Sequence, residues 1–265
     1  MQDSDLKILA VNIGNSRVSA AIVAGADVGA ISDAPANDPR AAADMIVELA
    51  HGLEDAARAA IILASVNMEA STQIAGMLEG RTPCGVYRVG SDLVIPQAHT
   101  LGPNHTTGQD RLLNALAAYQ AVNQACVVVD AGTAVTVDFV DGEGVFHGGA
   151  IAPGARMQLR SLHEQTSALP DVELAWPDDS EAFAKTTPQA MLQGVCIGIR
   201  GMVRALLERY AERYGAYPQV VATGGDASLL FGSDELIDNI VPDLTLRGIA
   251  AAAQAALAEA DAAAE

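Results

Sequence analysis

The chain has 265 residues, half of them apolar and only 4% aromatic, and it carries 33 acidic against 15 basic side chains. A chain of this length can bury a sizeable core, as one large domain or two modest ones. Its formal net charge of −18 at pH 7 excludes nucleic-acid binding as a main function, because a phosphate backbone is bound by an excess of Lys and Arg.

The cysteines and the amino terminus are typical of a cytoplasmic protein. Cys84, Cys126 and Cys196 lie far apart, and two of them sit inside apolar runs, so we expect buried, reduced thiols. The sequence contains no C-x-x-C motif and no Cys/His cluster, so we expect no structural zinc site. The first residues, MQDSDLK, lack the apolar stretch of a signal peptide, and no uncharged apolar run reaches membrane-spanning length. We therefore expect no membrane partner.

The first half of the chain is predicted to hold three short strands, followed by helices and strands in alternation. Short apolar runs that end in Gly-containing turns indicate strands, and apolar residues three and four apart indicate helices. The expected strands are at 7–14, 17–25, 27–34, 59–66 and 84–90, and the expected helices are at 39–55, 68–80 and 111–124.

The same pattern then starts again. Strands are expected at 125–132, 134–142, 144–154 and 219–225, and helices at 155–166, 188–214 and 246–263. The chain thus divides into two similar α/β halves, each with one mixed sheet. We place the boundary inside the helix at 111–124, with residues 1–115 as the N-terminal half and 116–265 as the C-terminal half.

Two turns with related sequences, VNIGNS and VDAGTA, occupy equivalent places in the two halves. Their glycines let the backbone approach a ligand closely, and the polar residues beside them offer hydrogen-bond donors to anionic oxygens. A single Gly turn in a hairpin is most often only a turn, but a third Gly pair follows a later strand. We predict a nucleotide-phosphate clamp across a cleft between the halves. Its residues are Asn12, Gly14, Asn15, Ser16, Gly132, Thr133, Gly224 and Gly225.

The motifs, taken together, resemble those of the type III pantothenate kinases, which belong to the actin/Hsp70/sugar-kinase superfamily. They are VNIGNS at 11–16, GQDR at 108–111, VVVDAGTAVTVD at 127–138, GGAIAPG at 148–154, TTPQAMLQG at 186–194 and TGG at 223–225. The resemblance covers nearly the whole chain. It implies two RNase H-like/actin-like halves, each a mixed five-stranded type of sheet with flanking helices.

The resemblance also implies a reaction, the transfer of the γ-phosphoryl group of ATP to pantothenate in the first step of coenzyme A biosynthesis. Asp110 would be the catalytic carboxylate that accepts the hydroxyl proton; its alternative role is a helix N-cap. Asp130 aligns with a monovalent-cation site for K⁺ or NH₄⁺, and Asn12 is a weak ligand for a divalent cation such as Mg²⁺.

Four residues are expected at the pantothenate site by the same resemblance. Gly108 gives the acceptor access to the backbone, and Gln109 and Arg111 flank Asp110. The Arg111 guanidinium suits the pantothenate carboxylate, although it could also be a solvated charge at a helix start. Thr187 would reach the neighbouring active site of a homodimer; alternatively it caps a helix that begins at Pro188.

Three departures from the family pattern keep other functions open. Asn12 stands where the family has Asp, Ser19 replaces a frequent Lys while we expect Arg17 on the other face of its strand, and the loop at 99–107 differs. One alternative is a catalytically impaired homologue with a binding or regulatory role. Another is a kinase of the same superfamily that phosphorylates a different small alcohol.

Overall fold

The structure, a computed structural model, describes residues 7–53, 59–178 and 182–264. It divides into two compact units. The first contains the chain up to Ala98, the segment Gly102–Gln120 and the residues from Asp243 onward, and the second contains His99–Leu101 and Ala121–Pro242.

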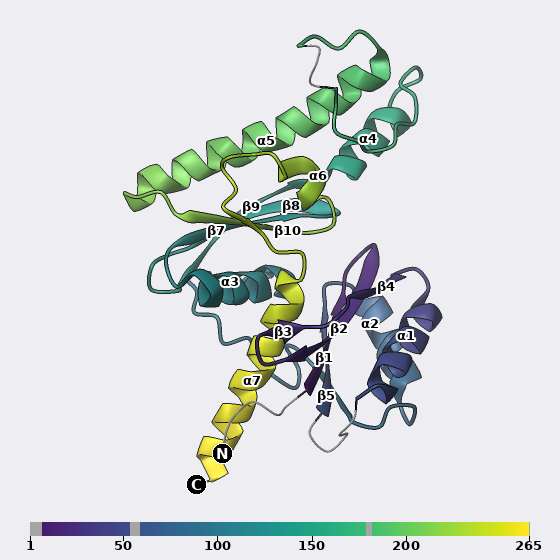
Figure 1. Cartoon of the computed structure of the whole chain (residues 1–265), viewed down its shortest axis with the longest axis vertical. Coiled ribbons are helices and arrows are strands. Elements are labelled where there is room, and N and C mark those ends of the chain that lie inside the picture. The colour runs from purple at the N-terminus through teal and green to yellow at the C-terminus, as the bar shows by residue number, and fades with distance from the viewer. Residues whose placement is uncertain (1–6, 54–58, 179–181, 265) are drawn as a thin grey trace. The chain divides into compact units, whose positions relative to one another are not determined.

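The first unit is a mixed sheet covered by helices (Figure 1). Its strands are β1 (Lys7–Ile13), β2 (Arg17–Ala24), β3 (Asp27–Val28), β4 (Ser32–Pro35), β5 (Ala59–Ser65) and β6 (Gly85–Arg88). The order is β3-β2-β1-β5-β6, with β1–β2 antiparallel and β1–β5 and β5–β6 parallel. The strand predicted at 27–34 is interrupted, so β3 and β4 both pair with β2.

The helices of the first unit are α1 (Pro39–His51), α2 (Met68–Leu78), α3 (Gln109–Val122) and α7 (Leu244–Ala264). The start of α1 follows the usual capping pattern, because the Asp38 side chain accepts the Ala41 N–H and Pro39 opens the helix. Alternate β1 residues supply two cores: Leu9 and Val11 join a cluster with α1 and α2, and Ile8 and Ala10 join one with α3 and α7.

The C-terminal helix α7 belongs to the first unit and not to the C-terminal half predicted from the sequence. It packs on β1, β2 and β5, and its Thr245 hydroxyl donates to the buried Asn114 Oδ1 at 2.7 Å. Gly248 allows this close approach, since a Cβ there would lie 2.2 Å from the Leu113 carbonyl oxygen. The predicted boundary at residue 115 falls within α3, which also lies mostly in the first unit.

The second unit repeats the same strand order. Its strands are β7 (Cys126–Ala131), β8 (Ala134–Val140), β9 (Phe146–Pro153), β10 (Gln219–Thr223) and β11 (Asn239–Ile240), and its helices are α4 (Ala155–Glu164), α5 (Thr187–Tyr214) and α6 (Ala227–Phe231). The order β11-β10-β7-β8-β9 mirrors that of the first sheet, with the β7–β8–β9 meander antiparallel and β10 and β11 parallel to β7. This repetition confirms two RNase H-like/actin-like halves.

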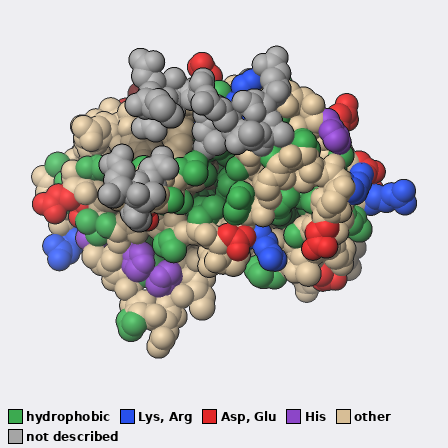
Figure 2. Space-filling model, turned by 90° about the horizontal axis from the view of Figure 1, so that it is seen from below, with side chains coloured by type: hydrophobic (Ala, Val, Ile, Leu, Met, Phe, Trp, Pro, Cys, Tyr) green, Lys and Arg blue, Asp and Glu red, His purple; other side chains and the backbone are tan. Residues whose placement is uncertain are grey.

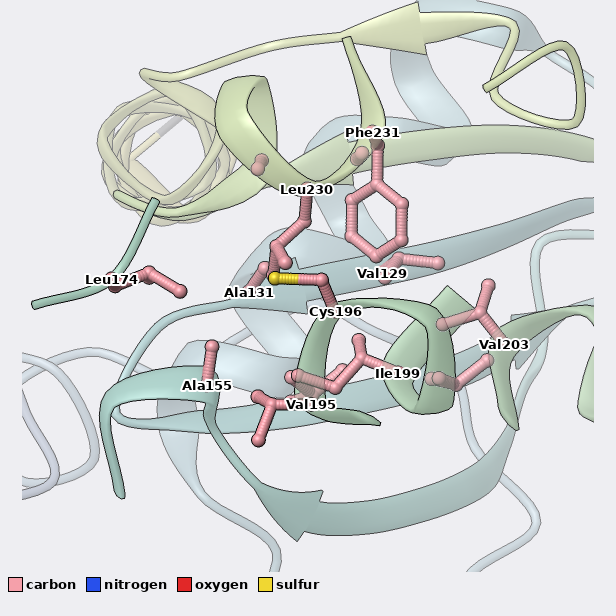
Figure 3. Packing of buried hydrophobic residues seen from close by; sticks show 14 of the residues in the cluster. Val129, Ala131, Ala155, Leu174, Val195, Cys196, Ile199, Val203, Leu230 and Phe231 are labelled. Atoms are coloured by element: carbon pink, nitrogen blue, oxygen red, sulfur yellow. The ribbon is translucent and has the colours of Figure 1, made fainter. Parts of the chain in front are cut away.

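The core of the second unit lies between its sheet and α5. Figure 3 shows Cys196 and Ile199 of α5 packed among Val129 of β7 and Leu230 and Phe231 of α6. By length and composition α5 could span a membrane, but Val195, Cys196, Ile199, Val203 and Leu207 are buried against the sheet. We therefore interpret α5 as a core helix.

Two of the three cysteines, Cys126 and Cys196, are buried as expected, and the third, Cys84, is half-buried. None of the three forms a disulfide. Burial raises the pKa of the Cys126 thiol to about 12, so it stays protonated. On the face drawn in Figure 2, the described Lys and Arg side chains are scattered among acidic ones and form no patch of the kind that binds nucleic acid.

Candidate active site

The first predicted phosphate turn joins β1 to β2 in the first unit. The Gly14 N–H donates to the Arg17 carbonyl at 2.9 Å, and a Cβ on Gly14 would lie 3.1 Å from that oxygen. Asn15 and Ser16 are exposed at the tip. The turn thus presents the predicted polar residues to solvent, at the carboxyl end of β1.

Asn12 lies at the same end of β1, between Ser19 of β2 and Ala64 of β5. The Ser19 hydroxyl donates to Asp33 Oδ1 on β4, and Arg17 Nε is 3.5 Å from the same oxygen. The expectation that Arg17 faces away from Ser19 is therefore wrong. Residues two apart in a strand share a face, and both side chains reach Asp33.

Gln109 fixes the start of α3 over the ends of β5 and β6. Its Oε1 accepts the Ser65 N–H at 3.2 Å, and its Nε2 donates to the Val89 carbonyl at 2.9 Å. Gly90, at φ +90°, leaves room for this amide, because a Cβ there would lie 2.6 Å from Nε2. Both ends of the amide are thus used within the protein, so Gln109 positions its neighbours.

Asp110 is the second residue of α3, not the residue that precedes it. Its Oδ1 accepts the N–H of the adjacent Arg111 at 2.8 Å, whereas an N-cap side chain accepts from two or three residues further on. Gly108 makes space for this carboxylate, since a Cβ there would lie 2.4 Å from Asp110 Oδ1 and 3.4 Å from Val66 Cγ1. The N-cap alternative therefore does not describe Asp110.

The surroundings of Asp110 shift the pKa of its carboxyl group. Burial raises its pKa, against the opposing effect of the Arg111 N–H and the Arg111 charge. A carboxylate with a raised pKa is a stronger base than an ordinary aspartate. Arg111 itself is half-buried and adjoins the carboxylate.

Thr187 is the first residue of α5 and is exposed. The helix is capped one residue earlier, by Thr186, whose side chain accepts the Gln189 N–H. The alternative in which Thr187 is the N-cap is therefore wrong, since Pro188 tolerates the second helical position as well as the first. The Thr187 hydroxyl is not the group that caps α5.

The second unit packs three turns together, which we call the glycine cradle: Asp130–Thr133, Pro153–Ala155 and Thr223–Asp226. The Gly154 N–H donates to the Thr133 carbonyl at 3.0 Å, and the Asp226 N–H donates to the Ala131 carbonyl at 2.9 Å. A Cβ on Gly154 would lie 2.2 Å from the Gly132 oxygen. At Gly224, where φ is +94°, it would lie 2.4 Å from the Ala131 oxygen and 2.5 Å from Asp130 Oδ1.

The structure thus brings together the residues that the sequence predicts for phosphate binding in the second half of the chain, Gly132, Thr133, Gly224 and Gly225, and places the predicted cation ligand Asp130 beside them. Backbone turns that exclude side chains let a phosphate group approach the main chain closely. Among the described residues, no group of three or more His, Cys, Asp or Glu is placed to hold a metal ion. A cation at Asp130 would therefore need further oxygens, which a bound triphosphate offers.

An ion pair that the sequence analysis missed borders this cradle. Arg156 Nη2 lies 3.1 Å from Asp226 Oδ1, and its Nε donates to the same oxygen at 3.2 Å. The signal was visible in the sequence: Arg156 stands in the first turn of a predicted helix, where a cation opposes the helix dipole, and Asp226 follows the Gly pair directly.

Comparison with protein families gives a match over most of the chain. The sequence profile of the type III pantothenate kinase family matches residues 8–209. A type III pantothenate kinase of Rhodospirillum rubrum is 42% identical over 142 residues, which is 54% of each chain. One from Dehalococcoides mccartyi strain 195 is 31% identical over 250 residues, covering 92% of this chain and 95% of the relative. In local matches such as the first of these, the chain spans about half the length of the relative.

Solved structures share the fold at low sequence identity. A conserved protein of Campylobacter jejuni, assigned to the Baf family of transcriptional activators, has a TM-score of 0.59 at 19% identity and covers 94% of this chain and 98% of its own. The ethanolamine utilization protein EutJ of Carboxydothermus hydrogenoformans has a TM-score of 0.51 at 17% identity, covering 93% and 89%. The profile match and the near full-length relative show that the chain belongs to the type III pantothenate kinase family.

Proposed function

We propose that this chain transfers the γ-phosphoryl group of ATP to the primary hydroxyl of pantothenate, the first step of coenzyme A biosynthesis. Family membership supports the reaction. The observation that carries it at the level of residues is Asp110, a half-buried carboxylate with a raised pKa, for which Gly108 leaves room. Phosphoryl transfer requires such a group beside the attacking hydroxyl, together with charge neutralisation and positioning.

Residues of both units have a part in this mechanism. The hydroxyl oxygen of pantothenate attacks the γ-phosphorus while the bond to the β,γ-bridging oxygen breaks and ADP leaves, and Asp110 accepts the hydroxyl proton. The Arg111 guanidinium binds the carboxylate of pantothenate. Gln109, held by the Ser65 N–H and the Val89 carbonyl, keeps both residues in place. The backbone N–H groups beside Gly14, Gly132, Gly224 and Gly225 and the side chains of Asn15, Ser16 and Thr133 donate to phosphate oxygens.

Cations complete the charge balance of a triphosphate bound to an acidic protein. Asp130 would hold a monovalent cation, K⁺ or NH₄⁺, next to the glycine cradle, and Asn12 would assist Mg²⁺ through an amide oxygen. When bound, these ions neutralise charge on the phosphate oxygens. We place the reaction in the cytoplasm, where ATP and pantothenate are available to a kinase of this family.

A coupled assay of ADP release, with and without pantothenate and with K⁺ replaced by Na⁺, tests this function. ADP release that requires pantothenate and is faster in K⁺ is the expected result. ADP release only with another small alcohol would show that the chain phosphorylates that alcohol and not pantothenate. Absence of turnover at saturating ATP, Mg²⁺ and K⁺ would indicate a catalytically impaired homologue. The uncharged side chain of Asn12 favours this alternative.

Asn12→Asp should lower the Mg²⁺ concentration that gives half-maximal rate. A carboxylate adds a charge that an amide lacks, and divalent-cation affinity rises with the number of charged ligands. The measurement is initial rate against Mg²⁺ at fixed ATP. Asn239→Asp is the matched control, because it makes the same amide-to-carboxylate change at an exposed position on β11 of the second unit, and it should leave the Mg²⁺ dependence unchanged. An unchanged Mg²⁺ dependence in Asn12→Asp would remove residue 12 from the metal site.

We further propose a homodimer that buries the outer face of α5. This face carries the small, exposed residues Ala190, Gly194, Gly198 and Gly201 beside Ile197, whose side chain is 48% exposed. Together with Met157 and Leu162 of α4 it forms an apolar surface on the second unit. Small residues let two helices approach closely, and apolar patches of this kind mark association sites. Thr187 at the start of α5 would then reach the partner's active site.

Gly198→Arg should convert the dimer into a folded monomer. A Cβ at this position meets nothing within 4 Å, so the change costs the protomer little while it puts a charge into the apolar face. Light scattering coupled to size exclusion reports the mass, and circular dichroism reports the fold. Gly76→Arg, at an equally open helical position on α2, should stay dimeric. A dimeric Gly198→Arg variant would contradict the proposed interface.

A further inference from the structure

Arg156 lies beside the glycine cradle of the second unit. Helix α4 begins directly after Gly154, whose N–H donates to the Thr133 carbonyl at 3.0 Å and whose backbone touches Gly132 closely enough to exclude a Cβ. Arg156 follows two residues later, in the first turn of α4. Because a cation at the first turn opposes the helix dipole, some other interaction must favour Arg at this position.

Asp226 supplies that interaction. Both Nε and Nη2 of Arg156 contact the single oxygen Oδ1, at 3.2 and 3.1 Å. The aspartate is 6% exposed, and its N–H donates to the Ala131 carbonyl at 2.9 Å. Burying an ionised carboxylate is costly unless it is paired, so the two groups hold each other, and one edge of the guanidinium is fixed at the cradle.

The other edge of the Arg156 guanidinium can bind a second anion. The side chain of Arg156 remains 60% exposed although its Nε side is bound. A guanidinium has five N–H donors in a planar fork, and the outer pair matches phosphate oxygens in a bidentate arrangement. In a chain with 33 acidic and 15 basic residues, an arginine fixed by a buried aspartate next to an anion-binding turn differs from a solvated surface charge.

We propose that Arg156 binds a phosphate oxygen of the nucleoside triphosphate from the second unit, and that Asp226 positions its guanidinium for this contact. The inference rests on the proposed function in that it takes ATP as the ligand of the cradle. It adds a nucleotide-binding residue and a positioning residue to the predicted phosphate turns. The competing role of Arg156 is to neutralise Asp226 and nothing more.

Arg156→Gln should weaken binding of a non-hydrolysable ATP analogue by about 10- to 100-fold, the range for one hydrogen-bonded contact between charged groups. Calorimetric titration of the full chain with the analogue and Mg²⁺ measures it. In steady-state kinetics the KM for ATP should rise while the KM for pantothenate changes little. Arg160→Gln is the matched control, since it removes an exposed arginine one turn further along α4, and it should bind the analogue like the wild type.

The double variant Arg156→Gln/Asp226→Asn separates nucleotide binding from charge neutralisation. Arg156→Gln alone leaves a buried carboxylate unpaired and should lower the Tm, and the double variant should restore it. We expect nucleotide binding to stay weak in the double variant. Wild-type affinity in the double variant would overturn the proposal, as would wild-type affinity in Arg156→Gln. If the wild type binds the analogue but does not phosphorylate pantothenate, the proposed function fails, and the same titrations still decide the role of Arg156.

Discussion

Asp110→Asn should reduce kcat for pantothenate phosphorylation by about 10²- to 10⁴-fold, the usual contribution of a positioned general base. The amide keeps the shape of the side chain and can still accept the Arg111 N–H that Asp110 Oδ1 now accepts at 2.8 Å, but it cannot take up the hydroxyl proton. The coupled ADP assay measures the rate. Binding of the ATP analogue should change much less than kcat, because Asp110 is proposed to contact the acceptor hydroxyl and not the phosphate oxygens.

The pH dependence of the wild type gives a second measure of the same carboxylate. Burial raises the pKa of Asp110 above 3.8, and the base works only when ionised, so kcat/KM should fall as the pH drops through this raised pKa. Asp110→Asn should lack that acid limb in its residual activity. A variant that keeps near-normal turnover would show that Asp110 is not the general base.

Asp110→Asn should lower the activity without lowering the free energy of unfolding. The folded pKa of Asp110 is higher than the unfolded one, so the native state binds the proton more tightly, and stability is lost as the pH rises from the unfolded towards the folded pKa. Above this window the ionised carboxylate disfavours the folded state. We therefore expect Asp110→Asn to be at least as stable as the wild type at neutral pH, by thermal or urea unfolding.

Gly224→Ala should abolish most nucleotide binding and destabilise the protein by roughly 1–3 kcal/mol, the range for a strained backbone combined with overpacking. Its backbone at φ +94° disfavours any side chain, and the new methyl would overlap the Ala131 carbonyl and Asp130 Oδ1 at 2.4 and 2.5 Å. Because these atoms are backbone or belong to the predicted cation ligand, the turn itself must move. Titration with the ATP analogue and thermal unfolding measure the two effects.

Gly215→Ala is the matched control for this glycine. It has nearly the same backbone conformation, φ +87°, at the end of α5, but a Cβ there meets nothing within 4 Å. It should therefore cost about 1–2 kcal/mol for the left-handed conformation and leave nucleotide binding intact. Equal loss of nucleotide affinity in the two variants would show that the tight packing at Gly224 does not shape the nucleotide site.

The sequence predicted most elements because their signals are local. The strand runs at 7–14 and 125–132 and the helix at 188–214 correspond to β1, β7 and α5 within a few residues, and the repeated pattern revealed the two halves. The sequence did not assign α7 to the correct unit. Its small apolar residues predict a buried face, but they do not identify the sheet on which that face packs. Its partners, such as Ile8 and Ala10, lie near the opposite end of the chain.

The sequence singled out the glycine turns that the structure packs together in the second unit, whereas it could not predict pairings between distant residues. Arg156 and Asp226 are separated by 70 residues, and no pattern in the sequence joins them, although the unfavourable helix-start position of Arg156 was a usable signal. Thr186 and Thr187 both precede Pro188, and only the observed Gln189 hydrogen bond decides which one caps α5. Arg17 was misplaced although the period of two in a strand sets it beside Ser19.

The position of α7 has a consequence for biosynthesis. The second unit is built from residues that all precede Asp243, mainly the continuous stretch Ala121–Pro242, so all its strands and helices are synthesised before α7. The first unit is made earlier but cannot complete its core, because Ile8 and Ala10 are covered by residues such as Ile249 and Ala252, which are synthesised after the whole second unit. Until α7 is made, one face of the first sheet keeps its apolar residues exposed in the nascent chain. We therefore expect the second unit to fold before the first, although it is synthesised later.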